Sequence, residues 1–150
     1  MIKKIFILLL FIISSCGYQP LYKINNNDDD KIREIEFGGD IKLSKKFYSS
    51  LPFKIIKNDN SLDKLVLNSK KNIVETSKNS KGQVVSNRTS ITLQVSFFDI
   101  KNDLIKEKTL TKNFLYNILD NKFELREYQN SIEKNLINQI IEDIKIYLNF

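Results

Sequence analysis

The thiol of Cys16 is the side chain with the clearest chemistry in this sequence, and it belongs to the only cysteine. Two lysines near the start are followed by an unbroken apolar run, residues 5–13, and two serines separate this run from Cys16. A basic start and a short apolar run that ends in small residues indicate a secretory signal, and this run is too short for a stable transmembrane helix. We therefore predict that residues 1–15 are an export signal that is removed directly before Cys16.

The residues before Cys16 resemble a bacterial lipobox, the motif at which enzymes attach diacylglycerol to a cysteine that becomes the new N-terminus. Ile13, Ser14 and Ser15 supply the branched apolar residue and the two small residues of this motif. The resemblance implies a lipoprotein signal peptide at 1–15 and a Cys16 that carries a covalent diacylglycerol and an N-acyl chain, with no other cofactor. Several acyl chains make a stable anchor, because each buried methylene contributes about 0.8 kcal/mol. The alternative is an ordinary signal peptide followed by an incidental cysteine.

Carboxylates are plentiful in this sequence, but no pair of them has a reason to face each other across a cleft. The sequence contains no histidine, which removes the usual general base and every Ser-His or Cys-His arrangement. None of the four glycines belongs to a phosphate-binding loop. The acidic run Asp28-Asp29-Asp30 lacks the alternating spacing of a calcium loop and follows three asparagines, which favours a solvated tether. We therefore predict neither an enzyme nor a metal site.

Length and composition indicate one folded domain behind a tether. Removal of residues 1–15 from the 150-residue chain leaves room for a single core. We expect 16–30 to form the lipidated N-terminus and tether, and 31–150 to form the domain. No second apolar stretch approaches the roughly 20 residues of a transmembrane helix. The protein is therefore expected to sit on a membrane through its lipid.

The formal net charge of +6 and the pI near 9.3 would suit a nucleic-acid-binding protein. The export signal argues against that partner, because an exported, tethered protein does not meet chromosomal DNA. In a Gram-negative envelope the abundant anions are lipid headgroups and the phosphorylated sugars of lipopolysaccharide. A generic solvated surface, rich in lysine through genome composition, explains the charge equally well, so charge alone does not identify the partner.

The N-terminal part of the domain is predicted to hold a strand and a short helix. Apolar and polar residues alternate over 31–37, and Gly38-Gly39 end the strand. Asp40 suits the N-cap of a helix. Pro52 ends this helix, because proline disfavours helical geometry in the residue before it. The apolar residues of one helical face fall four apart: Leu43, Phe47 and Leu51.

The middle of the domain is predicted to be an antiparallel meander of three strands. Asn and Lys interrupt the strand-forming residues of 62–76, so we expect a bulge or break there. Alternation over 90–97 gives the next strand one dry face and one polar face. Turns are expected at 79–82 and 101–103. The last strand covers 104–118, and its apolar residues on one side are Leu110, Phe114, Tyr116 and Ile118.

The C-terminus is predicted to be a long amphipathic helix that packs on the sheet. Asn121 and Glu124 have the spacing of a capping box. Charged and polar residues, Glu133 among them, occupy the solvated side. The apolar stripe contains Tyr128, Ile132, Leu136, Ile137, Ile140, Ile141, Ile144, Tyr147 and Leu148. The order of elements, β-α-β-β-β-α, predicts an α+β domain of two layers.

The residues that follow the lipobox are similar to the start of mature LptE, the lipopolysaccharide-assembly lipoprotein, in its alphaproteobacterial form. There the lipidated cysteine is followed by glycine, an aromatic residue, one further residue and Pro-Leu-Tyr. The matching residues are Gly17, Tyr18, Pro20, Leu21 and Tyr22. The resemblance implies a two-layer sandwich in which two helices pack on one face of a four-stranded, mostly antiparallel sheet. It also implies a motif for partner binding or tethering, and the alternative is that these residues only stiffen the tether.

LptE proteins sit inside the LptD outer-membrane β-barrel as a plug and assembly factor, and the pair moves lipopolysaccharide to the outer leaflet. The resemblance therefore implies an outer-membrane lipoprotein of a Gram-negative bacterium, with LptD and lipopolysaccharide as partners. A lipid in the inner leaflet would hold it on the periplasmic side. The basic side chains implied to bind lipopolysaccharide are Arg88, Lys106, Lys108 and Lys112.

A sheet covered by helices on one side leaves its other face free. We expect Ser90, Thr92, Gln94 and Ser96 to lie on that face and to contact a barrel wall or a sugar surface. The leading alternative function is a lipid-anchored envelope accessory or amphiphile-binding protein without a barrel partner. A barrel protein that copurifies with the chain would separate the two functions.

Overall fold

The computed structural model describes residues 31–56 and 63–148. The predicted signal peptide, Cys16 and the motif from Gly17 to Tyr22 lie outside the described residues, so the lipid anchor stays a prediction. Within the described part of the chain, no helix is both long and apolar enough to cross a membrane. The same residues bring together no group of three or more His, Cys, Asp or Glu side chains able to hold a metal ion.

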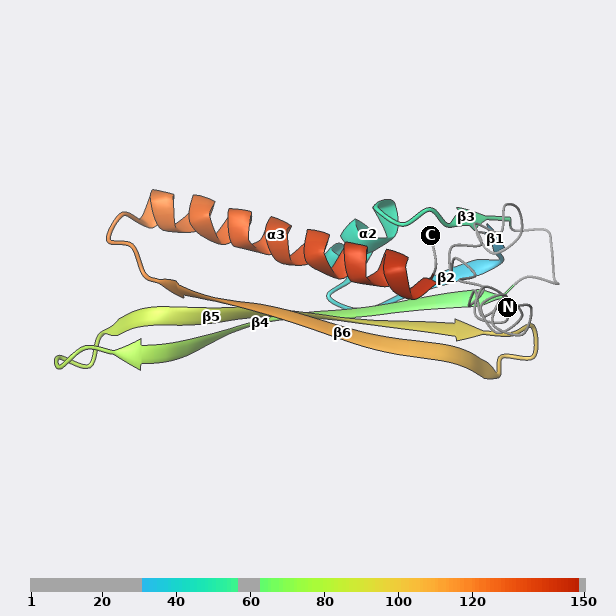
Figure 1. The fold of residues 1–150 in the computed structure, drawn as a ribbon, viewed down its shortest axis with the longest axis horizontal. Coiled ribbons are helices and arrows are strands. Elements are labelled where there is room, and N and C mark those ends of the chain that lie inside the picture. Colours follow the sequence, from blue (N-terminus) through green and yellow to red (C-terminus); the bar gives the residue numbers. More distant parts are fainter. Residues whose placement is uncertain (1–30, 57–62, 149–150) are drawn as a thin grey trace, which may run out of the picture.

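Two helices pack on one face of a four-stranded sheet (Figure 1). The strand order is β2-β4-β5-β6, with β2 parallel to β4 and the other neighbours antiparallel. The elements are β2 (Glu34–Gly39), α2 (Ile41–Ser49), β4 (Lys64–Lys78), β5 (Val84–Phe98), β6 (Leu104–Asn117) and α3 (Lys122–Leu148). A second, parallel pair of short strands is formed by β1 (Lys31–Ile32) and β3 (Lys54–Ile55). The predicted α+β class and the mostly antiparallel sheet with two helices are therefore confirmed.

One detail of the strand predictions is wrong, because a bend at Arg33 divides the strand expected over 31–37 into β1 and β2. β4 runs unbroken through the Asn and Lys residues from Lys64 to Asn72, and the expected irregularity lies at its far end, where the register shifts between Glu75 and Lys78. The polar residues Asn68, Lys70 and Asn72 are exposed and point away from the helices. Polar side chains at such positions continue the alternation of a strand instead of interrupting it.

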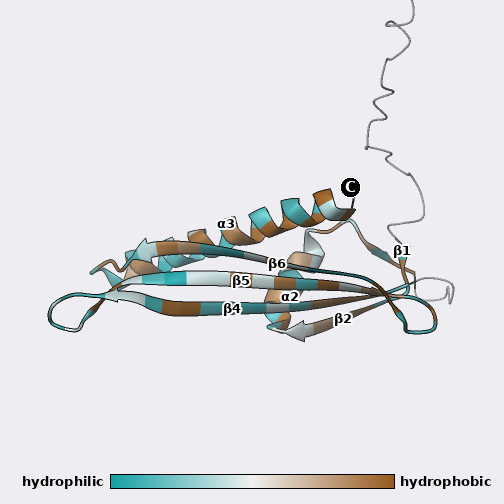
Figure 2. Ribbon diagram, turned by 60° about the horizontal axis from the view of Figure 1, so that its bottom comes forward, coloured by the Kyte–Doolittle hydropathy of each residue, from teal (hydrophilic) through white to brown (hydrophobic). Residues whose placement is uncertain are grey.

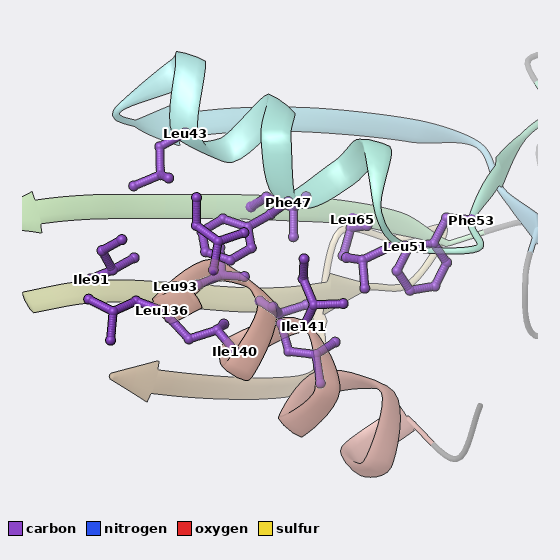
Figure 3. Packing of buried hydrophobic residues seen from close by; sticks show 14 of the residues in the cluster. Leu43, Phe47, Leu51, Phe53, Leu65, Ile91, Leu93, Leu136, Ile140 and Ile141 are labelled. Carbon is purple, nitrogen blue, oxygen red and sulfur yellow. The ribbon is translucent and has the colours of Figure 1, made fainter. Parts of the chain in front are cut away.

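The core lies between the sheet and the two helices (Figure 3). Its largest side chains come from α2, from the helix-facing positions of β4 and β5, and from the stripe of α3: Leu43, Phe47, Leu65, Leu67, Ile91, Leu93, Val95, Ile132, Leu136, Ile137, Ile140, Ile141 and Ile144. Full burial of one such side chain stabilises the fold by about 1.5–3 kcal/mol. The predicted stripe of α3 is thus confirmed over its central turns. Tyr128 is the exception at 38% exposed, and its ring meets the Tyr116 ring edge-on.

A tight backbone junction joins β2, α2 and β4. Gly39 has a φ of +63°, in the left-handed region that favours glycine. Directly after it, the backbone N–H of Asp40 donates to the carbonyl oxygen of Ser69 at 2.8 Å. The hydroxyl groups of Ser44 and Ser69 are buried, 2.7 Å apart, and lie 3.0 Å from the carbonyl oxygens of Gly38 and Asp40 respectively. The junction therefore leaves little space around Gly39.

The N-termini of both helices are capped by the residues that the sequence indicates. The carboxylate of Asp40 accepts the backbone N–H of Leu43 at 3.0 Å. The side-chain oxygen of Asn121 accepts the backbone N–H of Phe123 at 2.9 Å. Each bond satisfies one of the backbone donors that the first turn of a helix leaves unpaired. The starting points of α2 and α3 are therefore set by local sequence.

Candidate functional site

The face of the sheet that points away from the helices carries polar residues along the middle of β5. Figure 2 shows the ribbon from the side of this face, with each residue coloured by its hydropathy. Alternation along the middle of β5 buries Thr89, Ile91, Leu93 and Val95 under the helices. It places Ser90, Thr92 and Gln94, half-buried, on the opposite face. We call this surface the open sheet face. Ser96 lies on the same face but is only 6% exposed, with Val66 and Glu107 as its neighbours across the strands. The predicted polar face is thus present, but the side chain of Ser96 is buried and does not contribute to its surface.

Hydrogen bonds between strands organise the open sheet face. Thr92 lies between Lys70 of β4 and Thr111 of β6, and the hydroxyl oxygens of the two threonines are 2.9 Å apart. The side-chain amide of Gln94 donates to the carboxylate of Glu107. Such cross-strand pairs hold short polar side chains in one orientation on a rigid surface. The face therefore offers hydroxyl, amide and ammonium groups to a polar partner.

The four basic residues implied to bind lipopolysaccharide do not lie together. Lys106, Lys108 and Lys112 are on the helix-facing side of β6, in register with the core residues of β5. Arg88 is on the open sheet face, where it is exposed and has Val74 and Leu115 as its strand neighbours. The structure therefore brings three of the candidates together on one edge strand and separates the fourth.

The three lysines of β6 contact the C-terminal part of α3. The ammonium nitrogens of Lys106 and Lys108 lie 4.2 Å and 5.3 Å from the centre of the Tyr147 ring. The Lys112 nitrogen lies 2.7 Å from a carboxylate oxygen of Asp143. A cation over an aromatic ring contributes about 0.5–1 kcal/mol at an exposed site. Lysines on an edge strand also discourage its pairing with a strand of another molecule. These side chains thus have a structural role in addition to any ligand contact.

A cluster of ion pairs that the sequence prediction missed joins α2, β4 and α3. The two carboxylate oxygens of Glu133 lie 2.5 Å from the nitrogen of Lys46 on α2 and 2.6 Å from that of Lys71 on β4. They line a cavity of about 160 Å³ together with Asp40, Lys42 and Leu43. The assignment of Glu133 to the solvated side of the helix is wrong, because its side chain is only 17% exposed. Helical periodicity does not show where a second helix covers the flank of an apolar stripe.

The ion pairs change the titration of Glu133. Partial burial raises the pKa of this carboxyl, but the hydrogen bonds and positive charges of Lys46 and Lys71 outweigh burial, so that the pKa lies below its usual 4.5. A carboxylate with a lower pKa in the folded state stabilises that state above its unfolded pKa, and the stabilisation is lost as pH falls through the folded value. The contribution of Glu133 is therefore complete at neutral pH and declines below pH 4.5.

We expect Glu133→Gln to lower the free energy of unfolding at pH 7 by about 1 kcal/mol, a small value because the two lysines remain 48% and 30% exposed. The difference between wild type and variant should shrink when urea denaturation is repeated at pH 3, because that pH lies below the usual pKa of 4.5 and the carboxyl of the unfolded chain is then protonated. Glu142→Gln is the control, because Glu142 pairs with Lys145 at 3.2 Å on the surface. Equal losses for the two variants at pH 7 would show that the three-element cluster adds nothing beyond a surface ion pair.

No protein-family model matches this sequence, and no curated protein matches it. Solved structures, by contrast, share its fold. Rare lipoprotein B from Shewanella oneidensis superposes with a TM-score of 0.50 and 11% identity, over 78% of this chain and 99% of that chain. A minor lipoprotein from Acinetobacter baumannii gives 0.57 and 15%, over 81% and 92%. A lipoprotein from Caulobacter crescentus gives 0.50 and 13%, over 77% and 87%. The chain therefore has the LptE-like fold of rare lipoprotein B, as its N-terminal motif implies.

Proposed function

We propose that this chain is an outer-membrane lipoprotein that plugs an LptD-type β-barrel and supports its assembly, so that lipopolysaccharide can enter the outer leaflet. The acylated Cys16 holds the domain at the inner leaflet, on the periplasmic side. The domain supplies a rigid body with a polar surface for the barrel lumen. Its basic side chains contact lipopolysaccharide, for which Arg88 and the lysines of β6 remain the candidates.

The observation that carries the proposal is the agreement of fold and N-terminal motif in one chain. The fold is that of rare lipoprotein B, and this chain matches nearly the whole of that protein. The motif is the run from Cys16 to Tyr22, which resembles the start of mature LptE. A shared fold at 11% identity does not select a partner by itself. The motif is a feature of the sequence and the fold is a feature of the described residues, so the two give independent support.

The open sheet face is the surface that we assign to the barrel. The interior of a large outer-membrane barrel is polar and wet. Thr92, Gln94 and Thr111 present polar groups on long, hydrogen-bonded strands, and they match such a wall in chemistry. Because these side chains are short and already ordered, their contact with a partner costs little conformational entropy.

Affinity purification of the tagged protein from detergent-extracted outer membrane, followed by mass spectrometry, tests the proposed function. A large β-barrel protein recovered in equal amount would support it. Recovery of the lipidated protein alone would overturn the plug and favour a lipid-anchored envelope accessory or amphiphile-binding protein. Loss of function from one carboxylate substitution in a folded variant would instead indicate an enzyme.

We expect Thr92→Arg combined with Gln94→Arg to reduce recovery of the barrel protein roughly tenfold or more, because two bulky charged side chains would prevent close contact and would lose water against the barrel wall. Both positions face away from the core, so thermal unfolding of the variant should remain close to that of wild type. Asn135→Arg combined with Asn138→Arg places the same added charge on the exposed side of α3 and serves as the control. Undiminished recovery with the double variant would reject the open sheet face as the contact surface.

A further inference from the structure

The turns at the two ends of the long strands differ in composition. The turn between β4 and β5 consists of Asn79, Ser80, Lys81, Gly82 and Gln83, all of them polar or glycine. In the turn between β5 and β6, Ile100 is 53% exposed. Leu104 and Ile105, which open β6, are 52% and 56% exposed. We call residues 99–105 the apolar turn, because packing within the domain does not account for its three aliphatic side chains.

The apolar turn lies at the end of the molecule where the domain begins. Figure 1 shows it beside β1 and β3, at the end opposite the turn between β4 and β5. Further exposed aliphatic side chains lie at this end, since Ile55 of β3 and the following Ile56 are 40% and 37% exposed. β1 starts at Lys31, fifteen residues after Cys16. Fifteen residues span at most about 50 Å, so a lipid on Cys16 would tether the domain to the bilayer by this end and not by the opposite one.

The apolar turn is well defined and nearly neutral. The carboxylate of Asp99 accepts the backbone N–H groups of Lys101 and Asp103 at 2.8 Å each. Asn102 adopts a φ of +68° at the tip of the turn. Its charged residues are Asp99, Lys101 and Asp103, which together give a net charge of −1. An interaction of this turn with lipid would therefore depend on its aliphatic side chains and not on attraction to anionic headgroups.

We propose that the apolar turn is a second membrane contact, which inserts Ile100, Leu104 and Ile105 into the interface of the leaflet that holds the lipid of Cys16. The inference rests on the proposed lipid anchor and extends it from one point of attachment to two. The anchor raises the effective concentration of bilayer at the turn, so that a few partly buried side chains suffice.

The sequence contains no tryptophan, so a single introduced tryptophan is a unique fluorescent probe. The mature lipoprotein carrying L104W is reconstituted into vesicles of phosphatidylethanolamine and phosphatidylglycerol that contain a brominated phospholipid, which quenches tryptophan at short range. I105W is a second probe of the same turn, and S80W is the matched control at the opposite turn. All three positions are exposed, so folding tolerates the substitutions. We expect L104W and I105W to be quenched several-fold more than S80W.

The outcomes separate this inference from the lipid anchor. Equal quenching of L104W, I105W and S80W in protein that floats with the vesicles would overturn the second contact and leave the anchor in place. Protein that does not float with the vesicles would overturn the anchor and the second contact together. When a copurified barrel protein is included, blue-shifted but unquenched emission from L104W would place the turn against protein and would overturn the membrane contact.

Discussion

Cys16→Ser is expected to abolish acylation and to remove the protein from the outer-membrane fraction. Each buried methylene of the anchor contributes about 0.8 kcal/mol, so the loss of all acyl chains removes most of the free energy of membrane binding. The described part of the chain holds no helix that could replace the anchor. We therefore expect the membrane-bound fraction to fall by about 100-fold or more.

Density-gradient fractionation combined with labelled palmitate measures this loss directly. Ser15→Ala is the control, because alanine preserves the small residue before the cysteine and should leave both labelling and fractionation unchanged. If the serine variant of position 16 still fractionated with the outer membrane at wild-type level, the lipoprotein assignment would be wrong. The proposed barrel plug and the proposed second membrane contact both depend on the acylated Cys16, so neither proposal would then be supported.

Gly39→Ala is expected to destabilise the folded domain by about 3 kcal/mol or more, and to lower the midpoint of thermal unfolding by roughly 10 °C. A methyl group at this position would lie 2.1 Å from the carbonyl oxygen of Ser69 and 2.6 Å from the side-chain oxygen of Asn68. The carbonyl of Ser69 already accepts the N–H of Asp40, and the Ser69 side chain is buried against Ser44. The strands must therefore separate locally, in addition to the strain of a positive φ.

Gly82→Ala isolates the part of this effect that comes from backbone conformation. Gly82 has a φ of +77°, and a methyl group built there meets no atom within 4 Å. We expect this variant to lose only about 1 kcal/mol, the cost of a left-handed conformation for an L-residue. Thermal unfolding of the two purified variants, followed by circular dichroism, gives the comparison. Equal losses would show that the junction between β2, α2 and β4 can widen at little cost.

The parts of the fold that could be predicted from the sequence are those set by local patterns, namely alternation in strands and the spacing of apolar residues in helices. The alternation over 90–97 and the spacing of Ile132, Leu136 and Ile140 each define one buried face, and the observed burial agrees with both. Features that depend on a distant segment were not predictable in this way. The bend at Arg33 is one of them, because β1 turns aside to pair with β3, more than twenty residues later in the chain.

The candidate site was predictable to a similar degree. The open sheet face is the complement of a buried face, so alternation located Thr92 and Gln94 correctly. The same alternation places Lys106 and Lys108 on the side of Tyr116, toward the helix. Their contact with Tyr147 was nevertheless hidden, because no local pattern relates a strand to a helix residue some forty positions away. Glu133 was hidden for the same reason, since its two lysines come from different elements.

The strand order β2-β4-β5-β6 has a consequence for the time course of folding. β4, β5 and β6 are neighbours both in the chain and in the sheet, and α3 follows β6 directly. Pairing between segments that are close in sequence carries a small loop-closure cost and proceeds rapidly. We expect this C-terminal unit to form first, and β2 and α2 to join it afterwards. A chain whose first residues are still held by export or acylating enzymes can therefore complete most of its folding before its N-terminus is released.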